Sequence, residues 1–182
     1  MKEKLVIVIN GVGGCGKDTL IDLASKHFSC RNVSSVTPIK EMARRGGWVG
    51  EKTDEARKML SDLKAVMTAY NDLPQKYIVD QYNEFLAGDE EIMFVHIREP
   101  KNIWKFLDVV KPRSDMIVRD ASILVKRSSS PESVGNISDD GVEHYPYDAV
   151  FVNDYALHEA EIKFTCLIKH LIDYYGLSIE SK

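Results

Sequence analysis

A glycine-rich segment directly after a continuous apolar run constrains this chain more than any other feature. Residues 4–10 read KLVIVIN and residues 11–17 read GVGGCGK. A β-branched, continuously apolar run is typical of a strand that is buried on both faces of a parallel sheet. The helical pattern that follows from residue 17 completes a strand, a tight turn and a helix. This combination predicts an α/β fold.

The turn has the spacing of a loop that wraps around phosphate groups, with Gly11, four further positions, Gly16 and Lys17. Together with Gly13 and Gly14, these glycines allow positive φ and leave no Cβ to block an anion. Backbone N–H groups can then point inward, and the helix N-terminus adds positive potential. The Lys17 ammonium suits the β and γ phosphates of a nucleoside triphosphate. The alternative is a glycine-rich turn with an incidental lysine.

The residues beside the lysine suggest how a metal ion is held. Mg²⁺ next to phosphates needs hard oxygen ligands, usually a Ser or Thr hydroxyl, but here Asp18 follows Lys17 and Thr19 comes one place later. A carboxylate near three phosphates is repelled unless a cation lies between them, so we expect Asp18 and Thr19 to bind Mg²⁺. Alternatively, Asp18 only complements the helix N-terminus. Cys15, within the loop, is expected to be a small space-filling residue.

Apolar strands alternate with helical patterns along the rest of the chain, which predicts about five parallel strands in a single domain covering residues 1–182. Several helices start at a proline or at a good N-cap residue, as helix termini usually do. The further strands are expected at residues 31–36, 91–97, 122–126 and 147–153, and the helices at 17–28, 38–45, 53–70, 74–86, from 100 onward, and through 164–175.

Composition and charge exclude several classes of function. The 24 basic and 28 acidic residues give a net charge of −4, so the chain has no broad cationic field for nucleic acid. The three cysteines form no CxxC pair, which argues against a disulfide framework and a zinc site. No apolar run approaches the ~20 residues that span a bilayer, and the N-terminal run is too short for a signal peptide. We therefore expect a soluble cytoplasmic protein without a membrane or nucleic-acid partner.

The string GVGGCGKDT resembles the phosphate loop of nucleoside and deoxynucleoside monophosphate kinases, especially the phage and bacterial deoxynucleotide kinases. The similarity continues, in the family's order, in residues 35–60, 94–103 and 147–154. The resemblance implies a P-loop three-layer sandwich that transfers the γ-phosphoryl group of ATP, with Mg²⁺, to a nucleoside monophosphate. It also implies an acceptor-binding helical segment at about 37–88 and a short lid at about 127–146.

Arginine and lysine residues are the candidates for binding the acceptor phosphate. Arg98 follows a buried strand and should emerge at the carboxyl end of the sheet, where ligands of such folds bind; the alternative is a surface ion pair with Glu99. Arg57 and Lys64 share one face of a helix, and the resemblance favours Arg57 as an acceptor ligand, although a solvated face is the alternative. Lys40 begins the segment expected to cover the acceptor.

The polar stretch at 127–146 corresponds to the lid of related kinases. Arg127, at the end of a strand, is the candidate for stabilising charge in the transition state, and His144 is expected to be an ordinary loop residue. The resemblance places Asn153 in the segment that contacts adenine. Asp154 either contacts a ligand or caps the last helix.

One residue departs from the family pattern. Many members have an aspartate two residues before the arginine, and this chain has His96 there. Because a neutral imidazole is a poor Mg²⁺ ligand, metal binding would depend more on Asp18 and Thr19. The alternatives to a nucleoside monophosphate kinase are a kinase of another phosphorylated metabolite, such as dephospho-coenzyme A or phosphomevalonate, and a nucleotide-binding regulatory protein. The base, the sugar and a possible homodimer stay open.

Overall fold

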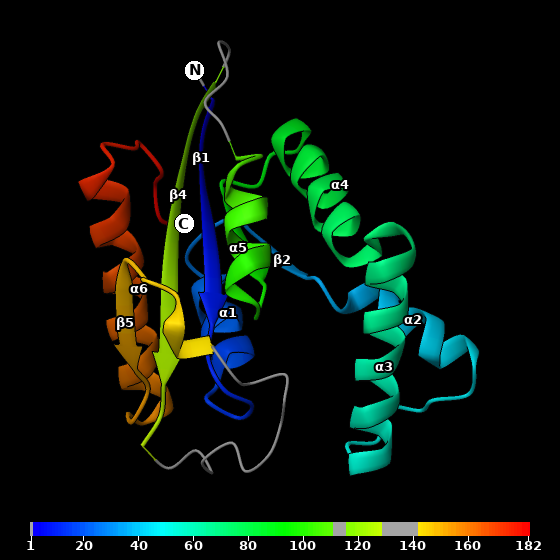
Figure 1. Ribbon diagram of the computed structural model, residues 1–182. Helices are drawn as coiled ribbons and strands as arrows, with labels where there is room; N and C mark the ends of the chain where they lie inside the picture. Colours follow the sequence, from blue (N-terminus) through cyan, green and yellow to red (C-terminus); the bar gives the residue numbers. More distant parts are fainter. Residues whose placement is uncertain (1, 111–115, 129–141) are drawn as a thin grey trace.

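A five-stranded parallel sheet lies between two layers of helices in the computed structural model, which describes residues 2–110, 116–128 and 142–182 (Figure 1). The strand order is β2-β3-β1-β4-β5. This confirms the predicted α/β three-layer sandwich. The strands are β1 (Lys2–Asn10), β2 (Cys30–Ser34), β3 (Ile92–His96), β4 (Met116–Lys126) and β5 (Ala149–Val152). The helices are α1 (Lys17–Ala24), α2 (Thr37–Arg45), α3 (Asp54–Asn71), α4 (Leu73–Ala87), α5 (Pro100–Leu107) and α6 (Leu157–Tyr174), with a 3₁₀ turn η1 (Val142–His144).

The central strand β1 is buried on both faces, which explains its continuous apolar sequence. Ile7 and Ile9 belong to one core cluster, formed with α1 and α6. Val6 and Val8 belong to a second cluster on the other face of the sheet, formed with α4 and α5. Because successive side chains of a strand point to opposite faces, a strand between two helical layers needs apolar residues at every position.

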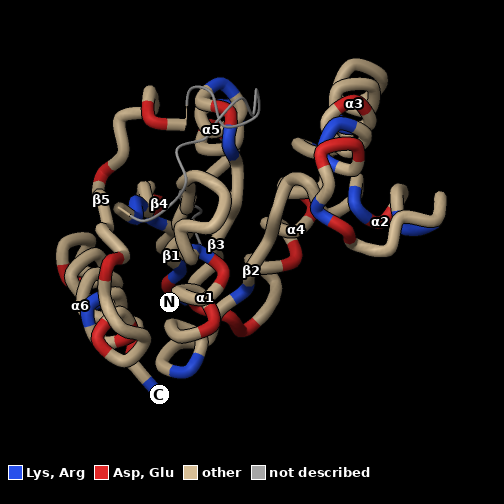
Figure 2. Tube along the Cα trace, turned by 90° about the horizontal axis from the view of Figure 1, so that it is seen from below, with Lys and Arg blue, Asp and Glu red and all other residues tan. Residues whose placement is uncertain are grey.

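All five strands run in the same direction, so their carboxyl ends meet at one edge of the sheet. On this edge Asn10, the last residue of β1, lies opposite Leu124 of β4, and Ser34 of β2 lies opposite His96 of β3. Figure 2 views the molecule from this side, with α1 in front of the sheet and α2 and α3 extending away from it. The loops after β1 and β3 are therefore neighbours.

Strand β4 and helix α1 differ in length from their predicted ranges. The sequence predicted a strand from residue 122, but β4 begins at Met116 and pairs with β1 from Met116 to Leu124. Arg119 and Asp120 interrupt its apolar run and conceal the first half of the strand. Helix α1 ends at Ala24 instead of continuing to Phe28. Phe28 is nevertheless buried in the core, because the chain turns back there toward β2.

Helix α3 lies outside the sandwich and packs on α2 and α4 (Figures 1 and 2). Its periodicity predicted a helix correctly, and the predicted N-cap is confirmed because the Thr53 hydroxyl accepts a hydrogen bond from the Ala56 N–H at 3.2 Å. The apolar stripe, however, is largely in solvent: Ala56 is the buried residue of α3, while Val66 and Tyr70 are 62% and 81% exposed. Two helices cover less of the stripe than a sheet would.

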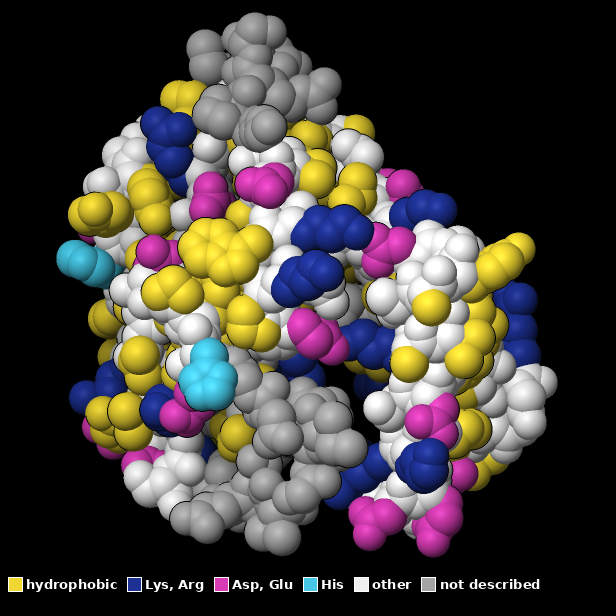
Figure 3. Space-filling view, viewed as in Figure 1, with side chains coloured by type: hydrophobic (Ala, Val, Ile, Leu, Met, Phe, Trp, Pro, Cys, Tyr) yellow, Lys and Arg dark blue, Asp and Glu magenta, His cyan; other side chains and the backbone are white. Residues whose placement is uncertain are grey.

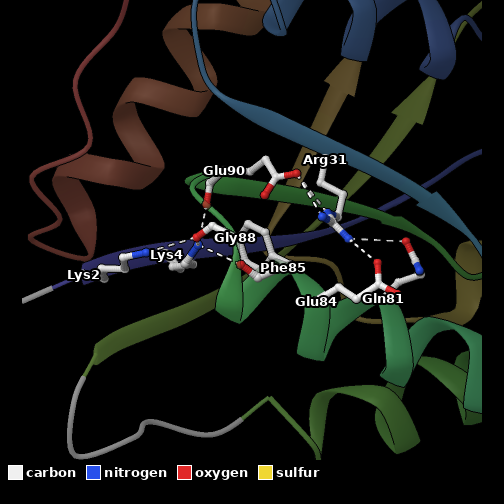
Figure 4. Close-up of polar contacts among 8 residues, drawn as sticks. All are labelled: Lys2, Lys4, Arg31, Gln81, Glu84, Phe85, Gly88 and Glu90. Carbon is white, nitrogen blue, oxygen red and sulfur yellow. Dashed lines mark hydrogen bonds and ion pairs between the residues drawn. The ribbon is translucent and has the colours of Figure 1, made fainter.

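A buried lysine anchors the C-terminal end of α4 to the sheet (Figure 4). Lys4 on β1 is only 2% exposed, and its ammonium donates hydrogen bonds to the carbonyl oxygens of Phe85, Gly88 and Glu90 at 2.8, 2.9 and 2.6 Å. The carbonyls at the end of a helix lack partners within the helix, and a buried cation satisfies them. The ammonium thus fixes one end of the helix whose other end joins α3.

An arginine on the edge strand β2 supports the same helix. Arg31 forms ion pairs with Glu84 of α4 and with Glu90, both at 3.0 Å, and its guanidinium also contacts Gln81 (Figure 4). These contacts hold α4 beside β2. The position of the α2–α4 helices relative to the sheet therefore depends on polar contacts at the end opposite the glycine loop.

Candidate functional site

The glycine loop joins β1 to α1 and adopts the conformation its sequence predicts. Gly11 and Gly16 have φ values of 145° and 90°, which side chains disfavour. A Cβ at Gly16 would also lie 2.5 Å from the side-chain nitrogen of Asn153. Gly13 and Gly14 are exposed, and the space around them is open. The backbone of Gly13 and Gly14 is therefore open to solvent.

The ammonium of Lys17 is folded into this loop. It donates hydrogen bonds to the carbonyl oxygens of Gly11 and Val12 at 2.6 and 3.1 Å, and it lies 3.3 Å from the sulfur of Cys15. Cys15 itself is fully buried in the core cluster beside α1, in agreement with a space-filling role. The ammonium of Lys17, the basic residue of positions 11–17, is thus turned toward the loop backbone.

The N-terminus of α1 has no side-chain cap among the described residues. Asp18 and Thr19 in its first turn are exposed. Within the described ranges there is no group of three or more His, Cys, Asp or Glu side chains that could hold a metal. Mg²⁺ typically takes one or two protein oxygens and completes its shell with phosphates and water. Asp18 and Thr19 fit that mode of binding.

His96 ends strand β3 beside the loop and is 15% exposed. Its Nε2 atom is 2.9 Å from the side-chain oxygen of Asn32 and 3.8 Å from the carboxylate of Asp18. Burial lowers the pKa of His96 to about 4, although the Asp18 carboxylate acts in the opposite direction. The imidazole is therefore neutral near pH 7.

The charges around His96 show which predicted residues the fold brings together. Three cations also act on His96, and each of them further lowers its pKa. They are Lys17, Lys40 and Arg98. These residues come from the glycine loop, from α2 and from the end of β3. The fold thus places the predicted phosphate-binding lysine and two of the predicted acceptor-binding cations around one histidine.

The acceptor side of the site is tied to helix α3. Glu99, directly after Arg98, forms an ion pair with Lys64 of α3 and accepts a hydrogen bond from Asn102. Burial by itself raises the pKa of Glu99, but the neighbouring Lys64 ammonium outweighs it, so the net pKa is lowered. Arg57 is half-exposed near the start of α3, 3.7 Å from Asp54, and no contact in the described structure joins it to the loop.

A hollow separates the α3 arm from the body of the molecule (Figure 3). Both basic and acidic side chains lie along its rim (Figure 3). The Lys64–Glu99 ion pair crosses from the arm to the end of β3.

Asn153 and Asp154 both form hydrogen bonds with other parts of the protein. Asn153 is buried, its side-chain nitrogen donates to the Cys15 carbonyl at 2.8 Å, and its backbone N–H donates to Lys126. The side chain thus braces the loop, and an adenine contact from this segment stays a prediction. Asp154 does not cap α6, because its carboxylate accepts hydrogen bonds from the backbone N–H and hydroxyl of Ser128, while the N-cap position is Ala156.

Most of the predicted lid lies outside the described residues, because residues 129–141 are not among them. Arg127, which directly follows β4, is exposed. At the other end His144 is also exposed, and Glu143 forms an ion pair with Lys126 at 3.1 Å. A role of Arg127 in phosphoryl transfer stays a prediction.

Sequence reasoning missed Asn10, which is 1% exposed and hydrogen-bonded to both the loop and the end of β3. A signal was present, because a polar amide ends an otherwise apolar strand directly before the first glycine. Its partners Ile97 and Arg98 lie more than 80 positions away and could not be read from the sequence.

No protein-family model matches the chain, and no curated protein matches it. Among solved structures, the chain is similar to a sugar kinase from Janibacter sp. HTCC2649 in its unliganded form. The identity is 15%, with 97% of this chain and 96% of the other covered, and the TM-score is 0.39. A similarity this low carries no argument about substrate. None of the helices in the described ranges is long and apolar enough to cross a membrane.

Proposed function

We propose that this protein is an ATP-dependent phosphotransferase whose acceptor is a nucleoside or deoxynucleoside monophosphate. One observation supports this function above the others. The glycine loop with Lys17 lies at the same sheet edge as Arg98 and Lys40, and all three cations act on His96. This arrangement supports a proposal in which the donor and the acceptor phosphates bind close to one another.

The residues divide into a donor and an acceptor group. In the donor group, the loop N–H groups and Lys17 bind the β and γ phosphates of ATP, and Asp18 and Thr19 hold Mg²⁺. The ion, when bound, neutralises charge that develops on the phosphates. In the acceptor group, Arg98 and Lys40 bind a monophosphate that carries about two negative charges.

Phosphoryl transfer requires alignment and charge neutralisation more than covalent participation of the protein. In this proposal the acceptor lies in the cleft between α3 and the body (Figure 3). Arg57, near the start of α3, and Arg127, directly after β4, are further proposed ligands. A neutral His96 adds no charge between the two sites. Its hydrogen bond to Asn32 holds the imidazole in one orientation beside Asp18.

Other acceptors and a regulatory role are the competing functions. A kinase of another phosphorylated metabolite would use the same donor residues. A nucleotide-binding regulator with little turnover is favoured by His96, which occupies the place of a metal-assisting aspartate and lies 3.8 Å from Asp18. A histidine at this position offers Mg²⁺ no carboxylate oxygen, whereas an aspartate would offer one.

A coupled assay with ATP, Mg²⁺ and a panel of ribo- and deoxyribonucleoside monophosphates tests the proposal. We expect phosphorylation of one or two bases. Lys17→Ala should lower turnover by about 100-fold or more, because it removes the cation that stabilises the transferring charge, while the circular dichroism spectrum stays unchanged. Lys169→Ala, on the exposed face of α6, is the control.

The outcomes separate the three functions. ATP binding by calorimetry without turnover of any acceptor favours the regulator. Turnover of a phosphorylated metabolite other than a nucleotide favours the second function. An undiminished rate in Lys17→Ala would remove the lysine from the mechanism.

A further inference from the structure

Asn10 lies between the two halves of the proposed site. It is the last residue of β1 and is 1% exposed. Its side-chain nitrogen donates hydrogen bonds to the carbonyl oxygens of Ile97 and Arg98, at 2.8 and 3.1 Å. Its side-chain oxygen accepts a hydrogen bond from the backbone N–H of Gly11 at 2.9 Å. One amide thus contacts the first residue of the glycine loop and the backbone of the candidate acceptor arginine.

The contacts of Asn10 are restrictive because the side chain is buried. A buried amide that loses a hydrogen-bond partner is left unsatisfied, which is unfavourable, so the side chain has little freedom to turn away. Both amide hydrogens and the oxygen are in use. Any shift of the Ile97–Arg98 backbone relative to Gly11 must stretch one of these hydrogen bonds. The amide therefore acts as a spacer of fixed length between the two segments.

We propose that Asn10 is a positioning residue that sets the Arg98 segment against the phosphate loop, so that donor and acceptor phosphates are aligned for transfer. This inference rests on the proposed function. Asn10 contacts no substrate and acts through the backbone of Arg98. Phosphoryl transfer is sensitive to such a spacer, because a displacement of about 1 Å can lower the rate of a positioned reaction by about 100-fold.

A second buried amide braces the loop from the opposite side and provides a matched control. Asn153, at the end of β5, donates to the Cys15 carbonyl at 2.8 Å and has no hydrogen bond to the Arg98 segment among the described residues. Asn153→Ala should disturb the loop alone and weaken ATP binding. A variant of Asn10 should instead disturb the relation between loop and acceptor segment. The two variants therefore separate loop stability from alignment.

The sharpest variant is Asn10→Asp, measured near pH 8. A carboxylate has nearly the same shape and still accepts from the Gly11 N–H, but it cannot donate to the two carbonyl oxygens. We expect ATP affinity by calorimetry to change by less than about 5-fold, while kcat/KM for the acceptor falls by about 100-fold. Asn10→Ala, which introduces no charge, provides the same measurement if the aspartate variant does not fold.

A double-mutant cycle with Arg98→Ala gives a readout that a purely structural role would not produce. If Asn10 acts through Arg98, the double variant should be no more than about 3-fold worse in kcat/KM than Arg98→Ala alone. Fully additive losses would overturn the proposal. An Asn10→Asp enzyme that loses ATP affinity and acceptor kcat/KM in equal proportion would also overturn the proposal. Such a loss of ATP affinity is expected only for the Asn153→Ala control.

Hydrogen exchange of residues 97–103 with and without ATP distinguishes failure of this inference from failure of the proposed function. If no acceptor is phosphorylated by the wild type, the function is wrong, and exchange then decides the inference. Slower exchange on ATP addition in the wild type but not in Asn10→Asp supports coupling through the amide. An equal response in both proteins, or none in the wild type, overturns it.

Discussion

The neutral, buried state of His96 makes protein stability depend on pH in a defined direction. The pKa is lowered from its ordinary 6.5 to about 4 by burial, opposed by Asp18 and reinforced by nearby cations. The unfolded chain therefore binds a proton at a higher pH than the folded chain. Between about pH 6.5 and 4, protonation favours the unfolded state, so stability falls as the pH falls. Above about pH 6.5 the contribution is constant.

The magnitude follows from the two pKa values. A difference of about 2.5 units corresponds to about 3 kcal/mol of unfolding free energy when the pH is below both values. At about pH 5, where the folded form is still neutral and the unfolded form is protonated, the loss is about 2 kcal/mol relative to pH 8. Working at pH 5 and above keeps the titration of most carboxylates out of the measurement.

Urea denaturation at several pH values between about 5 and 8 measures this effect, with His96→Asn as the test variant. The asparagine does not titrate and can still donate a hydrogen bond toward Asn32. We expect the wild type to lose about 2 kcal/mol more than His96→Asn over this range. His170→Asn is the control, because His170 is exposed on α6 and the variant should follow the wild type.

Parallel curves for the wild type and His96→Asn would refute the reasoning. They would mean that His96 has the same pKa in the folded and unfolded chains. A wild type that becomes more stable toward pH 5, relative to the variant, would mean that Asp18 outweighs burial and that the folded pKa is raised. Either result would remove the neutral imidazole from the description of the site.

Three further predictions concern stability and the proposed site. Lys4→Met should lower the unfolding free energy by about 2–4 kcal/mol in urea denaturation, because three carbonyl groups lose a buried donor; a loss below about 0.5 kcal/mol would contradict the anchoring role. Gly16→Ala should weaken ATP binding in calorimetry by about 10-fold or more, because a Cβ at φ 90° would lie 2.5 Å from the Asn153 amide; unchanged affinity would contradict the steric argument. Glu99→Lys should raise the acceptor KM, and adding Lys64→Glu should restore it in part by re-forming the ion pair with reversed charges; no restoration would show that the pair does not position α3.

Local patterns in the sequence determined the type of most elements and the phosphate loop. Strand and turn formation depend on residues that are close in sequence. The order of the apolar run of β1, the glycines after it and Lys17 is therefore enough to predict a strand, a turn and an anion site. The same reasoning located α3 and its Thr53 cap. It failed for the first half of β4, where Arg119 and Asp120 break the apolar pattern although backbone pairing with β1 continues.

Only the tertiary structure decided which distant groups meet. The sequence did not indicate the hydrogen-bond partners of Asn153 and Asp154, which are the Cys15 carbonyl and the Ser128 backbone N–H. Asn10 joins β1 to Arg98, a residue 88 positions later. Such pairings depend on the register of parallel strands and on the path of the helices between them. No local sequence pattern indicates which distant residues form a hydrogen bond, because their proximity results from the folding of the whole chain.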